Sequence, residues 1–592
     1  MYFCPHKILF YMKHIKSFFV LLASWSMYAT ATWAQTPFFT HTVEAGETVY
    51  SISKIYHVTT EDIYKLNPET RNGLRSGTTL KIPQNKADQK FSRFHTIAKG
   101  ETLFQLTQLY HVSAEDICLA NPGLTASNFK AGEVIVIPPS NGKEAEVQKA
   151  TDDKGTLSVL NSGCKEMHRV KRKETIFSIS QKYGLTTEQL IEANPEMKDP
   201  DYKLKKGSLV CIPYPEKKTV KKTPSNQELF PQKSGPEKMQ QITMGVLLPL
   251  TQQNSEGEKM IEFYQGLLLA VEDLKNMGTS VTVYTYDCGK SIADMKAVLT
   301  RPGLSKADVI FGPLSSAQIP TLGNFCRENK IKMVVPFSSQ CDEVYKNPYL
   351  YVSNVPKSAL FEETYKLLQD QFSNRHFVIW NSGEQREDDL TFINGLKRML
   401  NAHAIPFREV SAGSSSLQDY LSLGRKNIIV PNSASLKALN KLCSELNLFK
   451  VTNPEYQFSL LGHPEWQIYT NSQLENFFRF DTYIYSSFYK NMNKVACGPF
   501  ENRFEKDFHT ELQNTFPSFG MLGYDLGRFF LMGLANKGND FDSNISTWRT
   551  DPLQNDFYFK RASNWSGFIN NKAELIHYTP QKKIDVIEFT KK

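Results

Sequence analysis

Hydrophobic and polar positions near the N-terminus of this 592-residue chain follow one order three times. Each copy starts with a short alternating stretch, which predicts a strand, and continues with apolar residues at helical spacing. A second helix follows with Thr59, Ser113 or Thr186 as its N-cap residue, and an Asn-Pro pair ends it because proline disfavours a helical residue before it. A last strand closes on Ile-Pro. The pattern predicts three β-α-α-β modules, each of about 45 residues.

The copies also act as an internal comparison. From the Glu before the first helix to the Asn that ends the second, the spacing is identical in all three: Glu47 to Asn67, Glu101 to Asn121, and Glu174 to Asn194. Ser51-Ile52-Ser53-Lys54 fits a Ser-x-x-Lys nucleophile motif, but the other copies carry Gln108 and Gln181 in place of the Lys. The motif is therefore interpreted as one face of a helix.

From residue 240 onward the pattern changes to buried strands that alternate with amphipathic helices. This alternation is typical of an α/β domain with a mostly parallel sheet. Two series of strands are expected, at 242–250, 281–287, 307–316 and 331–339, and then at 375–383, 425–433 and 456–466. Helices are expected at 258–277 and around 523–534. The predicted fold class is α/β overall.

The N-terminus predicts export. Residues 18–31 are apolar, follow Lys13 and Lys16, and lead to Ala34, which is the order of a cleaved secretory signal at 1–34. Met12 is an equally good start of translation. No later stretch reaches 18 apolar residues, so no transmembrane segment is expected.

The charge is slightly basic. The chain carries a formal net charge of +8, which falls to +5 without the signal, because the signal holds three lysines and no acid. Nucleic-acid binding needs a concentrated basic face and is not expected. Part of the excess lies in a Lys/Pro-rich linker at 215–239, which is interpreted as a solvated tether, and a further linker is expected at 140–163.

Eight cysteines remain after the signal. Cys164 and Cys211 lie in the first and last strands of the third module, and a disulfide is predicted between them. Cys118 is interpreted as an ordinary apolar residue. No pair of cysteines has the spacing of a metal site, and no cofactor is expected. The spacing leaves the pairing of five cysteines open: Cys288, Cys326, Cys341, Cys443 and Cys497.

The three copies resemble the LysM module through their G-E-T, N-P and I-P motifs, at 41–84, 95–139 and 164–214. The resemblance implies binding of N-acetylglucosamine-containing glycan, meaning peptidoglycan, in a groove between the loop after the first strand and the loop before the last. Copy three departs from the pattern with Lys173 at the glycine position, so its binding is the least expected. The implied glycan-binding residues are Gly46, Glu47, Thr48, Asn67, Pro68, Gly100, Glu101, Thr102, Asn121, Pro122, Glu174, Thr175, Asn194 and Pro195. A purely structural role for the glycines and threonines, in turns and helix caps, is the alternative.

Residues 240–592 resemble the type I periplasmic binding proteins of the leucine/isoleucine/valine-binding class, through ADVIFGPLSS, IKMVVPFSSQCDEVYKNPYLYVSN and the GYD at 523–525. The resemblance implies a two-lobed domain with a cleft. Two features depart from it: Phe337 replaces a small residue beside the carboxylate site, and NSGEQREDDL lacks a stacking Tyr. Helix capping by the serines is the alternative, and Asp525 is expected to be structural. The implied cleft residues are Ser315, Ser316, Ser338, Ser339 and Glu465.

Catalysis is not expected, because no His belongs to an H-x-H or H-E-x-x-H motif and no Cys-His pair is recognisable. We therefore expect a non-catalytic, peptidoglycan-associated protein of the periplasm or cell envelope, whose larger domain senses a small-molecule ligand or docks a cell-wall enzyme. A solute-binding protein for an amino acid or related molecule is the alternative, and a peptidoglycan hydrolase is the less favoured third.

Overall fold

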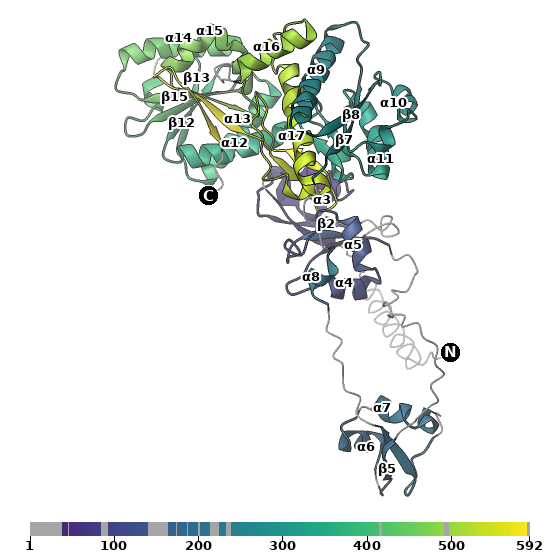
Figure 1. The fold of residues 1–592 in the computed structure, drawn as a ribbon. Helices are drawn as coiled ribbons and strands as arrows, with labels where there is room; N and C mark the ends of the chain where they lie inside the picture. The colour runs from purple at the N-terminus through teal and green to yellow at the C-terminus, as the bar shows by residue number, and fades with distance from the viewer. Residues whose placement is uncertain are drawn as a thin grey trace, which may run out of the picture. The chain divides into compact units, whose positions relative to one another are not determined.

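The structure is a computed structural model. It describes residues 38–44, 47–84, 93–139, 164–172, 174–185, 187–198, 202–213, 224–231, 238–413, 417–490 and 496–588. The predicted signal at 1–34 lies outside the described residues. The chain divides into two compact units, one of residues 1–141 with 226–592 and one of residues 142–225 (Figure 1). The third repeat thus forms a unit of its own.

Each repeat has the predicted β-α-α-β order, with its first and last strands paired antiparallel. Repeat one contains β1 (Phe38–Thr42), α2 (Val49–Ile55), α3 (Thr60–Leu66), η1 (Pro68–Asn72) and β2 (Thr79–Pro83). Repeat two contains β3 (Arg93–Thr96), α4 (Leu103–Tyr110), α5 (Ala114–Ala120) and β4 (Val134–Ile137). Repeat three contains β5 (Cys164–Arg169), α6 (Ile176–Lys182), α7 (Thr187–Glu192), η3 (Pro195–Lys198) and β6 (Leu209–Pro213).

The predicted caps of the second helices are confirmed where the structure describes them. The Thr59 hydroxyl accepts from the Asp62 N–H, and the Ser113 hydroxyl accepts from the Asp116 N–H. Thr186 lies outside the described residues. Ser51 and Lys54 both lie on α2, which confirms the helix-face interpretation of that motif.

The first lobe of the large domain is a seven-stranded sheet in the order β17-β18-β11-β10-β9-β7-β8. Only the β17–β18 pair is antiparallel. Its strands are β7 (Gln241–Leu248), β8 (Ser280–Asp287), β9 (Val309–Phe311), β10 (Lys332–Val335), β11 (Leu350–Val352), β17 (Phe559–Arg561) and β18 (Phe568–Asn570). The accompanying helices are α9 (Ser255–Asn276), α10 (Ile292–Leu299), η4 (Leu304–Lys306), η5 (Ser316–Gln318), α11 (Ile319–Asn329), η6 (Asp342–Tyr345), α16 (Cys497–Phe508), α17 (Phe519–Lys537), η9 (Gly538–Asp540) and α18 (Phe541–Asn544).

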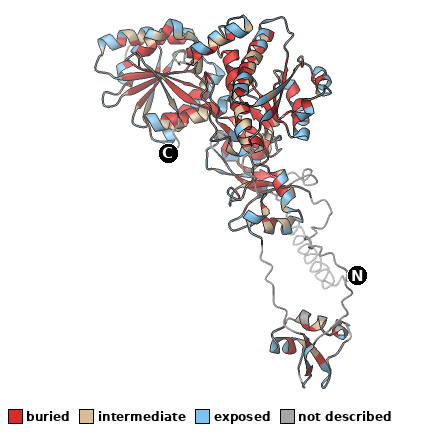
Figure 2. Cartoon of the chain, viewed as in Figure 1, coloured by how far each residue is buried: buried red, intermediate tan, exposed pale blue. Residues whose placement is uncertain are grey.

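The second lobe is also a seven-stranded sheet, in the order β13-β12-β14-β15-β16-β19-β20, with β19 and β20 antiparallel to their neighbours. Its strands are β12 (His376–Asn381), β13 (Phe407–Ser411), β14 (Asn427–Pro431), β15 (Phe458–Gly462), β16 (Thr482–Ser486), β19 (Glu574–Tyr578) and β20 (Ile584–Glu588). Its helices are α12 (Lys357–Phe372), α13 (Glu387–Ala402), η7 (Leu417–Tyr420), α14 (Leu436–Thr452), η8 (Pro464–Tyr469) and α15 (Thr470–Arg479). The central strands of both sheets are buried on both faces, as continuous apolar runs require (Figure 2).

The chain passes between the two sheets three times, after β11, after β16 and after β18. The large domain is therefore two-lobed, and the predicted α/β fold class with small β-α-α-β modules is confirmed. The last 40 residues supply strands to both lobes, which the sequence patterns did not predict.

Helix α17 carries the GYD motif and packs on α9 at very short range. A Cβ on Gly523 would lie 2.0 Å from the Phe263 carbonyl oxygen, so only glycine fits there. Asp525 is buried and accepts from the backbone N–H groups of Leu553, Gln554 and Asn555 at 2.7, 2.8 and 2.7 Å. The structural role expected for Asp525 is confirmed.

One part of the predicted tether is structured. Residues Asn226–Leu229 form the short helix α8, and Phe230 after it is buried. The interpretation of 215–239 as a solvated tether is wrong for this part, because a Leu-Phe pair at 229–230 provides apolar surface that packs on repeat two.

Candidate functional site

Every repeat contains a triad of His, Glu and Tyr side chains that joins its first strand to its first loop and first helix. In repeat one, His41 Nε2 lies 2.7 Å from Glu47 Oε2, and His41 Nδ1 lies 2.7 Å from the Tyr56 hydroxyl. The same distances are 2.7 and 2.9 Å for His95 with Glu101 and Tyr110, and 2.8 and 2.9 Å for His168 with Glu174 and Tyr183.

Burial raises the pKa of Tyr56 well above its ordinary value, and burial also raises the pKa of Tyr110 and of Tyr183. Each hydroxyl therefore stays protonated and can donate to Nδ1, while the Nε2–H of the same ring donates to the carboxylate. A neutral imidazole with its proton on Nε2 satisfies all three groups.

The Glu of each triad also fixes the first loop. Its Oε2 accepts a backbone N–H from three residues upstream: Glu47 from Glu44 at 2.7 Å, Glu101 from Ala98 at 2.9 Å and Glu174 from Lys171 at 2.6 Å. The Lys171 N–H and His168 lower the pKa of the Glu174 carboxyl. Through Oε2, each of these three carboxylates thus accepts hydrogen bonds from its own module.

The predicted Thr residues cap the first helices. The hydroxyls of Thr48, Thr102 and Thr175 accept the N3 backbone N–H, and the N3 side chain in turn accepts from the cap, which completes a capping box in every copy. Gly100 has a φ of +82°, a conformation that suits the turn before its cap. Gly46 lies outside the described residues.

The Asn of each Asn-Pro pair connects the second helix to the last strand. Asn121 Nδ2 donates to the Ile117 and Val136 carbonyls at 2.7 Å each, and its Oδ1 accepts the Val136 N–H at 2.8 Å. Asn67 and Asn194 make the same three bonds to Ile63 and Lys81 and to Leu190 and Cys211. Because the modules have only two strands, this amide acts as one residue of a third strand.

The predicted Glu, Thr and Asn side chains therefore hold the loops in shape, and their contact with a sugar stays a prediction. What the loops offer to a ligand is their backbone and the exposed residues after the Asn, such as Pro68 and Pro122. The His and Tyr of the triad were missed by sequence reasoning. The signal was present, because H-x5-E-x8-Y occurs in all three copies.

Repeat one contacts the first lobe through residues that the other copies lack. The Tyr50 hydroxyl donates to both carboxylate oxygens of Asp342, at 3.0 and 3.1 Å, and Lys54 Nζ lies 2.9 Å from the same carboxylate. The equivalent residues are Phe and Gln in copies two and three. A groove of about 680 Å³ lies beside this contact, between the first loop of repeat one and the mouth of the lobes.

Repeats one and two pack on each other and on the β17–β18 turn. Thr96 Oγ1 donates to the Thr40 carbonyl, and the Trp565 ring lies 5.4 Å from the Phe94 ring and 5.9 Å from the Tyr56 ring. Trp565 is 8 % exposed. The turn of the first lobe is thus buried in the junction between the two repeats.

The residues predicted for the cleft make separate local contacts. Ser315 stands at the N-cap of η5 without a side-chain capping bond, Ser338 Oγ donates to the Gln340 carbonyl, and Ser339 lines the 680 Å³ groove. Glu465 lies 3.8 Å from an Arg386 nitrogen and is partly exposed. Binding of a ligand by Ser315, Ser316, Ser338, Ser339 and Glu465 stays a prediction.

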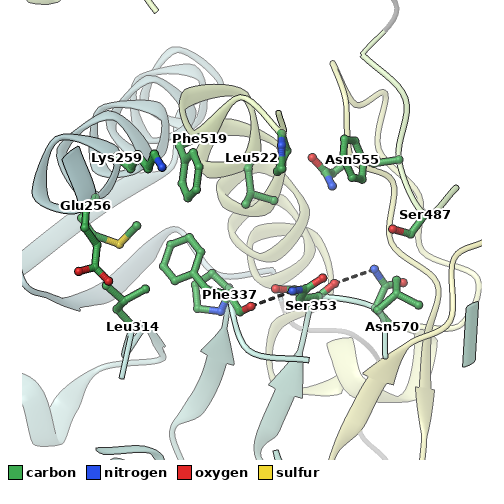
Figure 3. Close-up of a pocket in the computed structure, with 16 residues that line it drawn as sticks. Glu256, Lys259, Leu314, Phe337, Ser353, Ser487, Phe519, Leu522, Asn555 and Asn570 are labelled. Carbon is green, nitrogen blue, oxygen red and sulfur yellow. Dashed lines mark hydrogen bonds between the residues drawn. The ribbon is translucent and has the colours of Figure 1, made fainter. Parts of the chain in front are cut away.

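A pocket of about 360 Å³ lies where the lobes join, and none of these five residues is among its described lining. Phe337 occupies one side of it, with its ring 4.9 Å from Phe263 and 5.9 Å from Phe519. Figure 3 shows the Phe337 and Phe519 rings facing Ser487 and Asn555 across the pocket. The backbone around it is fixed by two amides, because Asn354 donates to the Phe337 carbonyl and Asn570 to the Ser353 carbonyl.

Cys211 is held in a disulfide. The side chain of Cys164 lies outside the described part, so the Cys164–Cys211 pairing stays a prediction. Six described cysteines are buried thiols outside any disulfide: Cys118, Cys288, Cys326, Cys341, Cys443 and Cys497. Within the described ranges, no group of His, Cys, Asp and Glu side chains is arranged to hold a metal ion. No helix in the part of the chain that the structure describes has the length and apolar character to cross a membrane.

Comparison with known proteins agrees with the architecture. The family model of the LysM domain matches residues 41–83, 95–138 and 168–213, so the chain contains three LysM domains. The chain is also similar, at low identity, to solved structures of ABC transporter proteins. A solved structure of a putative branched-chain amino acid ABC transporter from Rhodospirillum rubrum is 13 % identical, covers 58 % of this chain and 99 % of that chain, and has a TM-score of 0.42. A branched chain amino acid ABC transporter periplasmic ligand-binding protein from Burkholderia xenovorans is 14 % identical, covers 58 % and 94 %, and has a TM-score of 0.36.

Curated relatives match over a quarter of the chain. N-acetylmuramoyl-L-alanine amidase sle1 of Staphylococcus epidermidis is 26 % identical over 159 residues, which are 26 % of this chain and 46 % of the relative. Probable N-acetylmuramoyl-L-alanine amidase AmiB of Haemophilus influenzae is 24 % identical over 161 residues, 27 % of this chain and 29 % of the relative. The chain thus spans less than half the length of either relative.

Proposed function

We propose that this protein binds peptidoglycan in the bacterial envelope through its LysM domains and uses its two-lobed domain to sense a ligand or dock a partner. The observation that carries the proposal is the internal frame of the repeats. In all three repeats the same set of side chains, His, Glu, Tyr, Thr and Asn, holds two loops in the same geometry. The backbone groups of these loops are therefore the groups that can bind a ligand.

Backbone N–H and C=O groups suit an uncharged sugar that carries acetamido and hydroxyl groups, since each offers one donor or acceptor and no charge. A glycan polymer presents the same sugar many times. Several weak sites on one chain therefore gain through effective concentration. The curated relatives are by name N-acetylmuramoyl-L-alanine amidases, and the similarity over about a quarter of the chain supports a wall glycan as the target.

Co-sedimentation of the protein with purified peptidoglycan tests the proposal. We expect the protein to sediment, and a tetramer of N-acetylglucosamine to release it. A tetramer of glucose is the matched control, because it has the same linkage without the acetamido groups. If the protein does not sediment, or if both tetramers release it equally, it does not bind N-acetylglucosamine-containing glycan specifically, and the proposal is refuted.

The role that we propose for the two-lobed domain is binding and not catalysis. Wall anchoring favours a sensor or a dock for a cell-wall enzyme, because a solute shuttle has to diffuse to its transporter. The competing function, binding of an amino acid or related solute, is supported by the 360 Å³ pocket, whose volume suits a small ligand. Phe337 argues against it, because its ring takes up one side of the pocket.

Calorimetry against amino acids and muropeptides separates these two functions. Saturable heat with an amino acid would favour the solute reading. Absence of heat, together with a wall enzyme that co-purifies with the protein, would favour the dock.

A further inference from the structure

Repeat two differs from the other copies in what touches its first and second loops, between which the LysM resemblance implies a glycan groove. Its first loop ends at Leu103, whose backbone N–H donates to Asn226 Oδ1 at 3.0 Å. Its second loop contributes Phe129, whose ring lies 6.0 Å from that of Phe230 in an edge-on contact. Asn226 and Phe230 are the two ends of one short segment, formed by α8 and the residue that follows it.

The segment 226–230 packs into the apolar core of repeat two. Phe230 is 6 % exposed and belongs to the same apolar cluster as Leu103, Leu106 and Phe129 of repeat two. Asn226 and Phe230 thus reach both loops at once, the first through a polar bond and the second through apolar packing. A ligand that lies between these loops would have to take the same place.

A second part of the chain holds the second loop from outside. The Gly123 N–H donates to the Asn564 carbonyl at 2.7 Å, and Asn564 Nδ2 donates to the Val134 carbonyl at 3.2 Å. A Cβ on Gly123 would lie 2.6 Å from the Arg561 side chain and 2.9 Å from the Asn564 carbonyl oxygen. Copies one and three carry Glu69 and Glu196 at this position, so copy two alone has the residue that permits the contact.

The chemistry of Asn226 matches that of the proposed ligand. Its side chain is a primary amide, and its carbonyl oxygen accepts a backbone N–H of the first loop, as the carbonyl of an acetamido group would. We propose that the segment Asn226–Phe230 occupies the glycan groove of repeat two as an internal substitute, and that wall glycan and this segment exclude each other. This inference rests on the proposed function, because it takes the two loops to be the glycan-reading surface.

The exclusion has a quantitative consequence. A tethered occupant competes at a high effective concentration, and the apparent affinity of repeat two falls by the fraction of time for which its groove is free. Release of the segment should therefore lower the glycan concentration that half-saturates repeat two by at least about tenfold.

Hydrogen exchange on the whole protein, titrated with a tetramer of N-acetylglucosamine, reads each repeat separately. In the wild type we expect glycan to slow exchange in the loops of another repeat before those at 97–103 and 123–134. In Phe230→Ser, amide exchange at 226–230 should become faster. The glycan concentration that gives half-maximal protection of the loops at 97–103 and 123–134 should fall at least about tenfold. Asn226→Ala, which keeps the apolar contact, is the second variant and should give a smaller shift in the same direction.

Gln108→Ala, an exposed position on α4 of the same repeat, is the control and should behave as the wild type. Equal protection of repeat two in the wild type and in both variants would overturn the inference while leaving glycan binding intact. Released segments without any gain of protection in repeat two would overturn it as well. Absence of protection in all three repeats would refute the proposed function and this inference together.

Discussion

The Asn that ends the second helix of each LysM repeat allows a sharp test of how these small modules are held together. In repeat three, Asn194 is 3 % exposed. Its Nδ2 donates to the carbonyls of Leu190 and Cys211 at 2.8 Å each, and its Oδ1 accepts the Cys211 N–H at 2.7 Å. Both backbone groups of Cys211 face this amide, because β6 pairs with a strand on one side only.

Asn194→Ala removes three hydrogen bonds and leaves the polar groups of a strand edge without protein partners. A net hydrogen bond contributes about 1 kcal/mol, and an unsatisfied buried group costs about 1–3 kcal/mol. We expect a loss of about 2–4 kcal/mol, with part of the edge regaining water as a partner. Since 1.4 kcal/mol is a factor of ten, amide exchange across 164–213 should quicken roughly 30- to 700-fold.

Hydrogen exchange read by mass spectrometry measures this directly on the full chain. Glu196→Ala, two residues on and exposed, is the matched control and should leave exchange unchanged. If Asn194→Ala and Glu196→Ala exchange alike, the amide does not act as a third strand, and the reasoning fails.

Four further results are expected. Asp342→Asn should cost no more than about 1 kcal/mol, because both partners in its ion pair with Lys54 are more than a third exposed, and thermal melting against Asp370→Asn checks this. Asp525→Ala should lower the stability of the large domain by at least about 3 kcal/mol in urea denaturation, since two buried and one partly buried backbone N–H groups lose a charged acceptor. A midpoint within error of the wild type would contradict this. Lys572 is 2 % exposed and lies 3.2 Å from Glu574 and 2.5 Å from Glu588, so Lys572→Met should destabilise by about 3–5 kcal/mol in the same assay. Burial raises the pKa of Glu574 to about 7 in the folded protein, so its contribution to stability is present below the unfolded pKa and is lost as pH rises through about 7. The melting temperature should therefore fall as pH rises through this range, and Glu574→Gln should remove that part of the fall. An unchanged pH dependence of the melting temperature in the variant would refute the assignment.

The repeats show how far internal comparison reaches. Equal spacing of Glu and Asn across three copies predicted the modules, and the N-caps at Thr59 and Ser113 followed from local sequence. The same comparison contained the His and Tyr of the buried triad, but spacing alone does not say that residues 41, 47 and 56 converge. Strands at 574–578 and 584–588 were missed, because their pairing with the second lobe is a long-range contact without a local signal.

By itself the sequence determined the α/β class, the three modules and the two series of strands, because helix and strand periodicity are local properties of the chain. Tertiary structure alone decided which predicted site residues are used internally and which segments lie against the grooves. Glu, Thr and Asn of the shared motifs bind backbone groups, and Glu also a His side chain, that only the folded module brings close. Gly123, Lys54 and the segment 226–230 gain their roles from residues more than a hundred positions away. Such contacts depend on the whole fold, so copies that share the same motifs come to make different contacts in one protein.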